Sequence, residues 1–347
     1  MTSSQRLRLF GGTASPYTRK MVSLLRYRQI PYSITWSDPA GALDALGIEK
    51  PSPTFHPTVL FEESAGDIEA VCDSTPIIRR LESACTDRSV IPEDPALAFV
   101  NYLLEDFGDE WCTKYMFHYR WYPAEDADNA GTLLPLGMDV TLAPDLLQTF
   151  KATFSERQIG RLYVVGSNDA TAPVIDASYR RFLAAMESLL EKQPYLLGQR
   201  PGSGDFALFG QLSQLVGFDP TSRAIAHEVS PRTVAWVLKM EDLCGLEPTA
   251  AGWEDIADLR EPLLPMLTEI GRVYVPALLA NAAAVAAGDK DWEAQIDGSP
   301  WTQRTFSYQA KCLQWINEEY RVLPAQDRER VNQLWAGTGC EAILVDS

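Results

Sequence analysis

The first 36 residues predict a strand, a helix and a second strand, and this unit constrains the fold more than any other feature. The run RLRLF (6–10) alternates apolar and basic residues and meets a Gly-Gly pair, as a strand followed by a loop does. Ser15 and Pro16 then form a typical helix start, with serine as N-cap and proline in the first turn. PYSITW (31–36) has the character of a strand. Together these segments predict a β-α-β unit.

Four further elements follow before residue 86. AGALDAL (40–46) predicts a short helix, and the proline-rich PSPTFHP after it predicts a loop. PTVLF (57–61) and IEAVC (68–72) predict two strands of a hairpin, and a helix is expected to begin at Asp73-Ser74. The predicted order is β-α-β-α-β-β-α, a compact mixed sheet with helices.

The pattern changes after the polar linker 86–95, because the rest of the chain shows helical periodicity with few strand candidates. We therefore predict two domains, 1–86 and 95–347, the second of them all-α. The helical segments are expected at 96–121, 143–164, 174–192, 204–217, 231–244, 262–287, 307–321 and 325–336.

Composition excludes several classes of function. The 347 residues carry a formal net charge of −17, and affinity for nucleic acid comes from Lys and Arg, so we expect no nucleic-acid partner. No run of about eighteen apolar residues predicts a membrane span, and the amino terminus lacks a secretory pattern, so a cytoplasmic location is expected. Six scattered cysteines and three histidines predict no metal site.

Three motifs in this order resemble the glutathione transferase family: Ser15-Pro16-Tyr17, His56-Pro57 entering a strand, and Asp73-Ser74 opening a helix. QRPGSGDFALFGQL (199–212) resembles a helix-capping segment of that family's second domain. The resemblance covers roughly residues 6–217 and implies an α+β thioredoxin-like domain followed by an all-α domain. It implies glutathione as co-substrate and usually a homodimer. The tail is similar only loosely to that of long bacterial members.

Ser15 is the candidate catalytic residue. A helix N-terminus presents free N–H groups and partial positive charge, and a hydroxyl there can hydrogen-bond a thiolate and lower the pKa of a bound thiol. The family places Cys, Ser or Tyr at the thiol, so the resemblance implies a Ser-type member. The absence of a cysteine nearby argues against disulfide exchange. The alternative is that Ser15 is a plain N-cap.

The resemblance also implies how glutathione would bind. Pro57 matches the family's cis-proline, which lets the backbone of His56 pair with the cysteinyl part of the ligand. Asp73 and Ser74 match the pair that holds the γ-glutamyl end, although both are also ordinary helix-cap residues. The side chain of His56 either reaches the glycyl carboxylate, as Lys50 does in the same hypothesis, or faces solvent.

The helix expected over 96–122 is rich in aromatic residues on one face. Phe107, Trp111, Tyr115 and His118 follow helical spacing, and together with Tyr17 they are candidates for the pocket of the co-substrate. Packing between domains or between subunits is the alternative. The aromatic segment 291–320 of the tail is expected to cover the pocket mouth or to form an oligomer contact.

The sequence thus favours an enzyme that binds glutathione, stabilises its thiolate and transfers it to a small hydrophobic or aromatic electrophile. Two alternatives stay open: a non-catalytic glutathione-binding or scaffold protein, and a glutathione-dependent isomerase or peroxidase.

Overall fold

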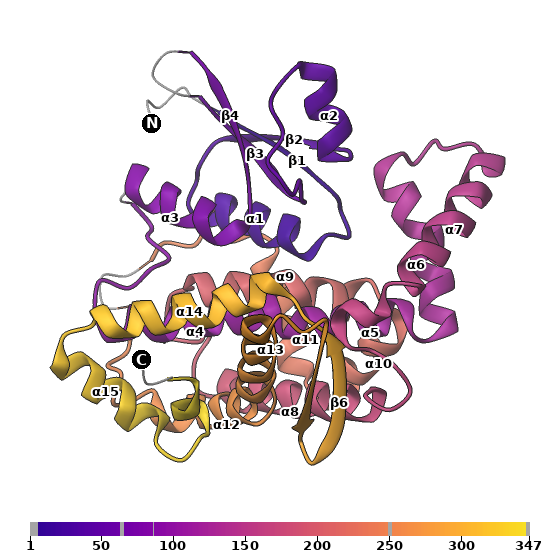
Figure 1. Cartoon of the computed structure of the whole chain (residues 1–347). Coiled ribbons are helices and arrows are strands. Elements are labelled where there is room, and N and C mark those ends of the chain that lie inside the picture. Colours follow the sequence, from indigo (N-terminus) through magenta and orange to yellow (C-terminus); the bar gives the residue numbers. More distant parts are fainter. Residues whose placement is uncertain (1–5, 63–65, 86, 249–251, 345–347) are drawn as a thin grey trace.

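The computed structural model describes residues 6–62, 66–85, 87–248 and 252–344. Figure 1 shows a small N-terminal domain standing on a larger helical domain. The N-terminal elements are β1 Leu7–Gly11, α1 Pro16–Tyr27, β2 Tyr32–Trp36, α2 Pro39–Leu46, β3 Thr58–Glu62, β4 Ile68–Cys72 and α3 Ser74–Ala84. The predicted order β-α-β-α-β-β-α is therefore confirmed.

The four strands form one mixed sheet in the order β2-β1-β3-β4. β1 pairs in parallel with β2 and antiparallel with β3, and β3 pairs antiparallel with β4. A parallel pair needs a crossover helix, and α1 supplies it, as the first 36 residues predict. Helices α1 and α3 lie between this sheet and the helical domain, while α2 lies further from that domain (Figure 1).

Helix α1 lies between the sheet and the helical domain, and most of its residues are buried. Met21, Leu24 and Leu25 belong to the hydrophobic core. On the side of the helical domain, α1 packs against α9, Ser203–Gly217. A Cβ atom at Gly210 would lie 2.6 Å from the carbonyl oxygen of Pro16, so the close approach of the two helices requires glycine there.

The rest of the chain is a helical domain, in agreement with the predicted fold class. Besides α9 it contains α4 Pro95–Glu110, α5 Cys112–Trp121, α6 Ala124–Met138, α7 Pro144–Ile159, α8 Ala172–Leu190, α10 Pro220–Val229, α11 Pro231–Met240, α12 Arg260–Glu269, α13 Val275–Ala287, α14 Ser307–Val322 and α15 Ala325–Trp335. The expected long helix over 96–122 is divided at Trp111, and α6 and α10 were not predicted.

A β-hairpin interrupts this domain, so the expectation of helices alone needs correction. Strands β5 Asp291–Ile296 and β6 Ser299–Arg304 pair antiparallel. The two-residue turn is Asp297-Gly298, with φ of 53° and 74°, the left-handed pair that a tight hairpin turn requires. Trp292 and Trp301 are buried on the hairpin's inner side.

Helices α12 and α13 are continuous through a π-helical turn, Ile270–Tyr274. Among the described residues, Arg260–Ala287 is the one helix whose length and composition would allow it to cross a membrane, with 44% of its most apolar window buried. Core helices of soluble proteins have the same properties. Helix α14 packs against both α13 and α4, which brings the C-terminal tail to the first helix of the domain.

Candidate functional site

The register of the sheet brings the three sequence motifs to the same edge. Phe10, one residue before the end of β1, pairs with Thr58 at the start of β3, and Thr58 pairs with Cys72 at the end of β4. The loop leading to Ser15, the His56-Pro57 pair and the Asp73-Ser74 pair therefore all leave the sheet at one end. This end faces the helical domain (Figure 1).

Ser15 is the N-cap of α1. Its backbone is extended, with φ −92° and ψ 118°, and its Oγ accepts a hydrogen bond of 3.2 Å from the N–H of Thr18. The side chain is only half buried, and a serine hydroxyl that accepts one bond still has its own hydrogen to donate. Capping the helix and donating to a ligand thiolate are therefore compatible.

The loop before Ser15 is held by a buried arginine of the other domain. Arg120, on α5, donates to the carbonyl oxygen of Ala14 at 2.8 Å and forms an ion pair with Asp219 at 3.0 Å. A third bond of 2.9 Å goes to Gln214. Because its donors are shared among these buried partners, Arg120 fixes the position of the loop.

The peptide bond between His56 and Pro57 is cis, as predicted. The imidazole lies beside the loop of Ser15: a Cβ atom at Gly12 would be 3.7 Å from His56 Nδ1 and 3.9 Å from Ser15 Cβ. His56 Nδ1 is buried and has no hydrogen-bond partner among the described residues. Burial lowers the pKa of His56, against the opposing charge of Asp38. The ring thus borders the site and does not extend into solvent.

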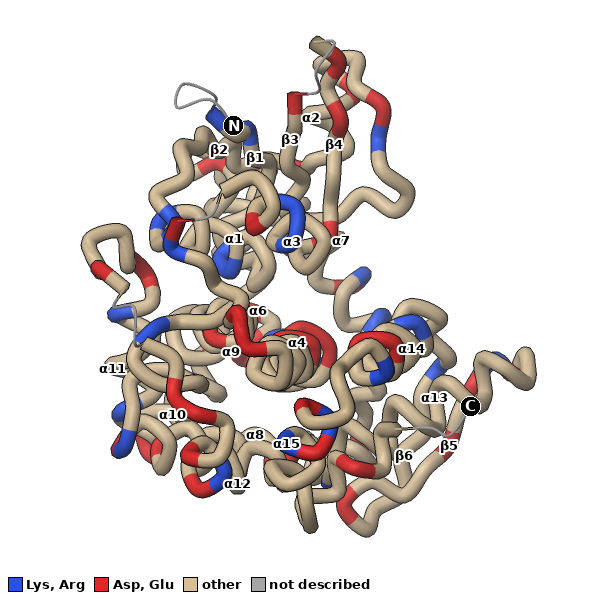
Figure 2. The backbone as a smooth tube through the Cα atoms, turned by 90° about the vertical axis from the view of Figure 1, so that its left-hand side faces the viewer, with Lys and Arg blue, Asp and Glu red and all other residues tan. Residues whose placement is uncertain are grey.

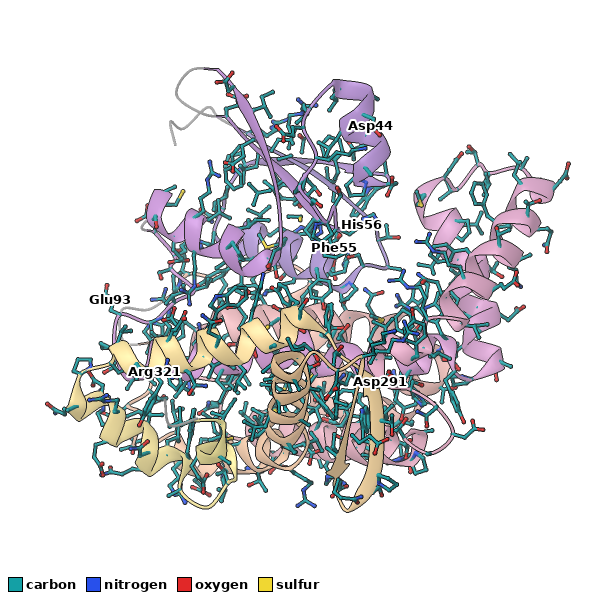
Figure 3. The ribbon with its side chains drawn as sticks, viewed as in Figure 1. Asp44, Phe55, His56, Glu93, Asp291 and Arg321 are labelled. Carbon is teal, nitrogen blue, oxygen red and sulfur yellow. The ribbon has the colours of Figure 1, made fainter. Side chains whose placement is uncertain are left out.

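Lys50 lies at the surface and forms an ion pair of 2.8 Å with Asp44, both side chains being exposed. Figure 3 shows Asp44, Phe55 and His56 on the part of the N-terminal domain that lies toward α6 and α7. A contact of Lys50 with glutathione stays a prediction.

Asp73 and Ser74 begin α3, and both side chains have partners from other elements. Asp73 has φ 82°, a left-handed conformation that is uncommon outside glycine, and its Oδ1 accepts from the N–H of Thr75 at 3.3 Å. Its Oδ2 accepts a bond of 2.6 Å from the hydroxyl of Tyr308, on α14. Ser74 is buried, and its Oγ accepts from Lys20 Nζ at 2.9 Å.

Lys20 lies at the centre of a buried polar cluster between the domains. Its ammonium group is 2.7 Å from Glu105 and 2.6 Å from Asp109, both on α4. Burial alone would lower the pKa of Lys20, but Asp109 and Glu105 raise it above its ordinary value, so the charge is retained. The acidic positions of α4 lie below α1 and α3 (Figure 2). The Lys20 ammonium group thus also holds the side chain of Ser74 in place.

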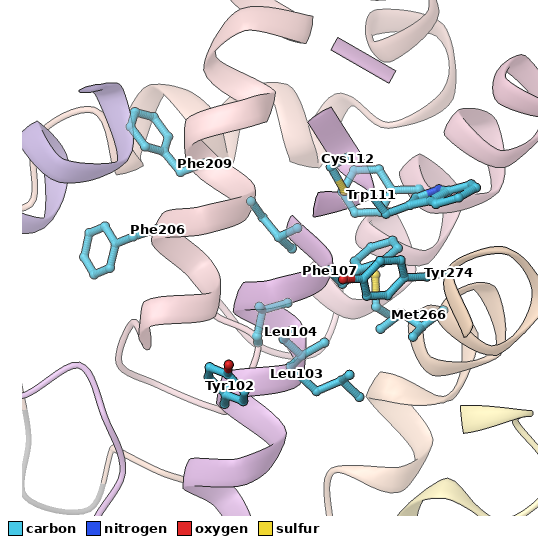
Figure 4. Close-up of a cluster of buried hydrophobic side chains, with 14 of the residues drawn as sticks. Tyr102, Leu103, Leu104, Phe107, Trp111, Cys112, Phe206, Phe209, Met266 and Tyr274 are labelled. Atoms are coloured by element: carbon cyan, nitrogen blue, oxygen red, sulfur yellow. The ribbon is translucent and has the colours of Figure 1, made fainter. Parts of the chain in front are cut away.

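The aromatic residues of α4 and α5 form core, not an open pocket. Phe107, Trp111 and Tyr115 are each 0% exposed, and His118 is 4% exposed. Figure 4 shows Phe107 and Trp111 beside Tyr274, whose ring centroid lies 5.9 Å from that of Phe107 and 6.3 Å from that of Trp111. This differs from the predicted pocket, because helix α8, the π-helical turn and β6 cover this face with Phe182, Tyr274 and Trp301.

Hydrogen bonds inside this core leave its polar atoms occupied. Tyr115 accepts from Trp111 Nε1 at 2.9 Å and lies 2.8 Å from Ser178 Oγ. His118 Nδ1 lies 2.7 Å from Ser167 Oγ, and burial lowers the pKa of His118 to about 4. Tyr17, the fifth candidate, is half buried and donates to the carbonyl oxygen of Asp109 at 2.8 Å.

Tyr308 contacts the candidate site through Asp73, and the sequence analysis did not predict this contact. It lies 235 residues beyond its partner Asp73, and no local pattern marks a contact of that range. All six cysteines are free, and among the described residues no group of three or more His, Cys, Asp or Glu side chains could hold a metal ion.

A thioredoxin-like domain followed by a helical domain defines a class of two-domain proteins. Two family models narrow this class. The glutathione S-transferase N-terminal domain matches residues 9–89, and the glutathione S-transferase C-terminal domain matches residues 169–238. These matches, in the family's own order, support the glutathione transferase family for this chain. No curated protein matches the chain at a significant level.

Several solved structures are similar to the chain at low identity and low TM-score. A glutathione S-transferase from Methylobacterium radiotolerans, in complex with glutathione sulfonate, is 20% identical, with coverage of 72% of this chain and 99% of that chain, at a TM-score of 0.40. One from Rhodospirillum rubrum is 18% identical, with coverage of 73% and 99% and a TM-score of 0.42. A family member from Pseudomonas fluorescens with two glutathione bound is 13% identical, with coverage of 69% and 89% and a TM-score of 0.41. These distant likenesses assign no substrate to this chain.

Proposed function

We propose that this chain binds glutathione at the edge defined by Ser15, His56-Pro57 and Asp73-Ser74, and that Ser15 stabilises the glutathione thiolate. The observation that carries the proposal is the register of β1, β3 and β4, which brings all three motifs to one end of the sheet. The match of residues 9–89 to the glutathione S-transferase N-terminal domain supports the choice of ligand.

Each motif meets one part of the tripeptide in this proposal. The backbone of His56 pairs with the cysteinyl residue as an added strand would. Ser74 Oγ and the free N–H groups at the start of α3 receive the γ-glutamyl carboxylate, and Asp73 receives its ammonium group. The hydroxyl of Ser15 and the N-terminus of α1 then meet the sulfur.

The reaction we propose is attack of the thiolate on a hydrophobic or aromatic electrophile. A C–S bond forms, and either a leaving group such as chloride departs with its electron pair or, in an isothiocyanate, the electron pair moves to nitrogen, which takes up a proton. An apolar surface next to the Ser15 loop supports this substrate class. The end of α6 touches the loop, since a Cβ atom at Gly137 would be 2.4 Å from Thr13 Oγ1. Directly after it, Met138 is 51% exposed and Val140 is 83% exposed. An apolar acceptor that covers these side chains would lie close to the bound sulfur.

A non-catalytic glutathione-binding protein is the second candidate. The observation that favours it is the bond from Thr18 to Ser15 Oγ, since it gives the serine a structural role that explains its presence without catalysis.

The test begins with binding to immobilised glutathione and continues with conjugation assays on chloronitrobenzene and isothiocyanate acceptors. Binding with conjugation is expected. Absence of binding at millimolar glutathione would contradict the whole proposal, whereas binding without turnover on any acceptor would favour the second candidate. Sedimentation of the same sample tests the predicted homodimer.

A further inference from the structure

Helix α14 reaches the N-terminal domain through one specific hydrogen bond. Tyr308, in the first turn of α14, donates its hydroxyl hydrogen to Asp73 Oδ2 at 2.6 Å. The next residue, Gln309, donates to the side chain of Glu110 on α4 at 3.1 Å. The start of α14 is thus tied both to the edge of the sheet and to the first helix of the helical domain.

The ring of Tyr308 is held by its aromatic neighbours. It packs edge-on against Trp315, with ring centroids 5.8 Å apart, and it lies beside Phe306, with centroids 6.1 Å apart. A tyrosine fixed in this way presents its hydroxyl at one place with little loss of side-chain entropy on ligand binding. The contact with Asp73 is therefore preorganised.

The atoms of this contact leave room for an ammonium group. Each oxygen of Asp73 accepts one hydrogen bond, from Thr75 N–H or from Tyr308, and a carboxylate oxygen can accept two. The phenolic oxygen of Tyr308 has given its only hydrogen to Asp73, so its remaining capacity is that of an acceptor. An ammonium group has three hydrogens to donate, and Asp73 with Tyr308 offers acceptors for them.

Among the described residues, the side-chain partner of Asp73 from another element is the neutral Tyr308 and not a cation. Burial and the charge of Asp73 raise the pKa of Tyr308, so its hydroxyl keeps the hydrogen that it donates to Asp73. The ammonium of Lys20, in contrast, is already held by Glu105, Asp109 and Ser74. The Asp73 carboxylate itself therefore favours a cationic ligand group beside it.

We propose that Tyr308, supplied by the C-terminal tail of the same chain, completes the subsite of Asp73 for the free α-ammonium group of a γ-linked amino acid. This inference rests on the proposed glutathione site and adds to it a specificity-determining residue. Tyr308 lies outside both regions that match the family models, 9–89 and 169–238. Tyr308 orients the Asp73 carboxylate and adds a second acceptor, so ligands without that ammonium group gain nothing from it.

The experiment compares Tyr308→Phe with the matched control Tyr320→Phe in the full chain. Tyr320 lies on the same helix, and its hydroxyl donates to Asn332 at 2.7 Å, away from Asp73. Calorimetry measures the affinity of each protein for glutathione and for the analogue that lacks the α-amino group. Tyr308→Phe is expected to weaken glutathione binding about tenfold, as the loss of one hydrogen bond to a charged group predicts, and to leave binding of the analogue unchanged. Tyr320→Phe should change neither.

Three results would overturn the inference: unchanged glutathione affinity in Tyr308→Phe, tighter binding, or equal weakening for both ligands. Wild-type protein that binds neither ligand would instead overturn the proposed function itself, so the two failures are distinguishable. Hydrogen exchange on the wild-type protein gives a readout independent of any variant. Glutathione should slow amide exchange at the start of α14, and the analogue without the amino group should not.

Discussion

Lys20 Nζ donates a hydrogen bond of 2.9 Å to Ser74 Oγ, which ties the hydroxyl at the start of α3 to a buried ammonium group on α1. Lys20 also holds Glu105 and Asp109, so Ser74 is a neutral member of a cluster that joins both domains. In the proposed site the γ-glutamyl carboxylate approaches this hydroxyl from the other side. The hydroxyl hydrogen is free to face the ligand because Lys20 occupies only an acceptor position.

The first prediction concerns Ser74→Ala. Glutathione affinity should fall about tenfold, because one hydrogen bond to the ligand carboxylate is lost. Stability should fall by only about 1 kcal/mol, because Lys20 keeps both carboxylate partners. Thr75→Val is the control: it removes the bond of 2.9 Å from Thr75 to Glu105 in the same turn, and it should affect stability but not affinity. Equal loss of affinity in both variants would assign Ser74 a purely structural role.

The second prediction separates the two roles of Ser15. Ser15→Ala removes both the N-cap of α1 and the proposed donor to sulfur, whereas Ser15→Asn keeps a side-chain oxygen that can cap the helix. We expect Ser15→Ala to lose about 1 kcal/mol of stability and Ser15→Asn to lose less. Both should raise the pKa of bound glutathione by about one unit, measured from thiolate absorbance against pH.

If thiolate formation is lost in Ser15→Ala but recovers fully in Ser15→Asn, it depends on the helix cap. The helix N-terminus alone would then activate the sulfur, and the serine hydroxyl would not be catalytic. Glutathione affinity is the internal check, because it should stay nearly constant in both variants.

The elements of the N-terminal domain could be predicted from sequence because their signals are local. Ser15-Pro16 marks the start of α1, and short apolar runs mark the strands. The hairpin β5–β6 carries an equally local signal, the Asp297-Gly298 pair between two alternating segments, and it contradicts the prediction of helices alone for this domain.

What covers each side chain could not be predicted in the same way. The helical spacing of the aromatic residues predicts that they share one face of α4, but this spacing does not distinguish the wall of a pocket from the core. That depends on Phe182, Tyr274 and Trp301, which come from distant parts of the chain. The bond from Tyr308 to Asp73 was unpredictable for the same reason.

The third prediction tests the apolar surface beside the Ser15 loop. Val140→Asp should raise KM for an apolar acceptor about tenfold, since an apolar contact is replaced by a solvated charge, and should leave KM for glutathione unchanged. Because Val140 is highly exposed, stability should change by less than about 0.5 kcal/mol. Leu238→Asp, on α11, alters an exposed apolar residue elsewhere and should leave both constants unchanged. The same change in both variants would mean that the acceptor lies elsewhere.

The fourth prediction concerns pH and the buried carboxyl of Asp106, which accepts a hydrogen bond of 2.5 Å from Tyr274. Burial raises the pKa of Asp106 from 3.8 to about 6. Between pH 3.8 and about 6 the folded state holds a proton that the unfolded state has released. The free energy of unfolding of the wild-type protein therefore falls as pH rises through this window. Asp106→Asn retains the neutral shape. As pH rises through the window, the free energy of unfolding of Asp106→Asn, measured by urea denaturation, should therefore increase relative to that of wild type by about 1.4 kcal/mol per pH unit. Asp291→Asn, at an exposed position, is the control, and its plot of unfolding free energy against pH should run parallel to that of wild type. If the plot for Asp106→Asn also ran parallel to that of wild type, the Asp106 carboxyl would be ionised in the folded protein throughout this window.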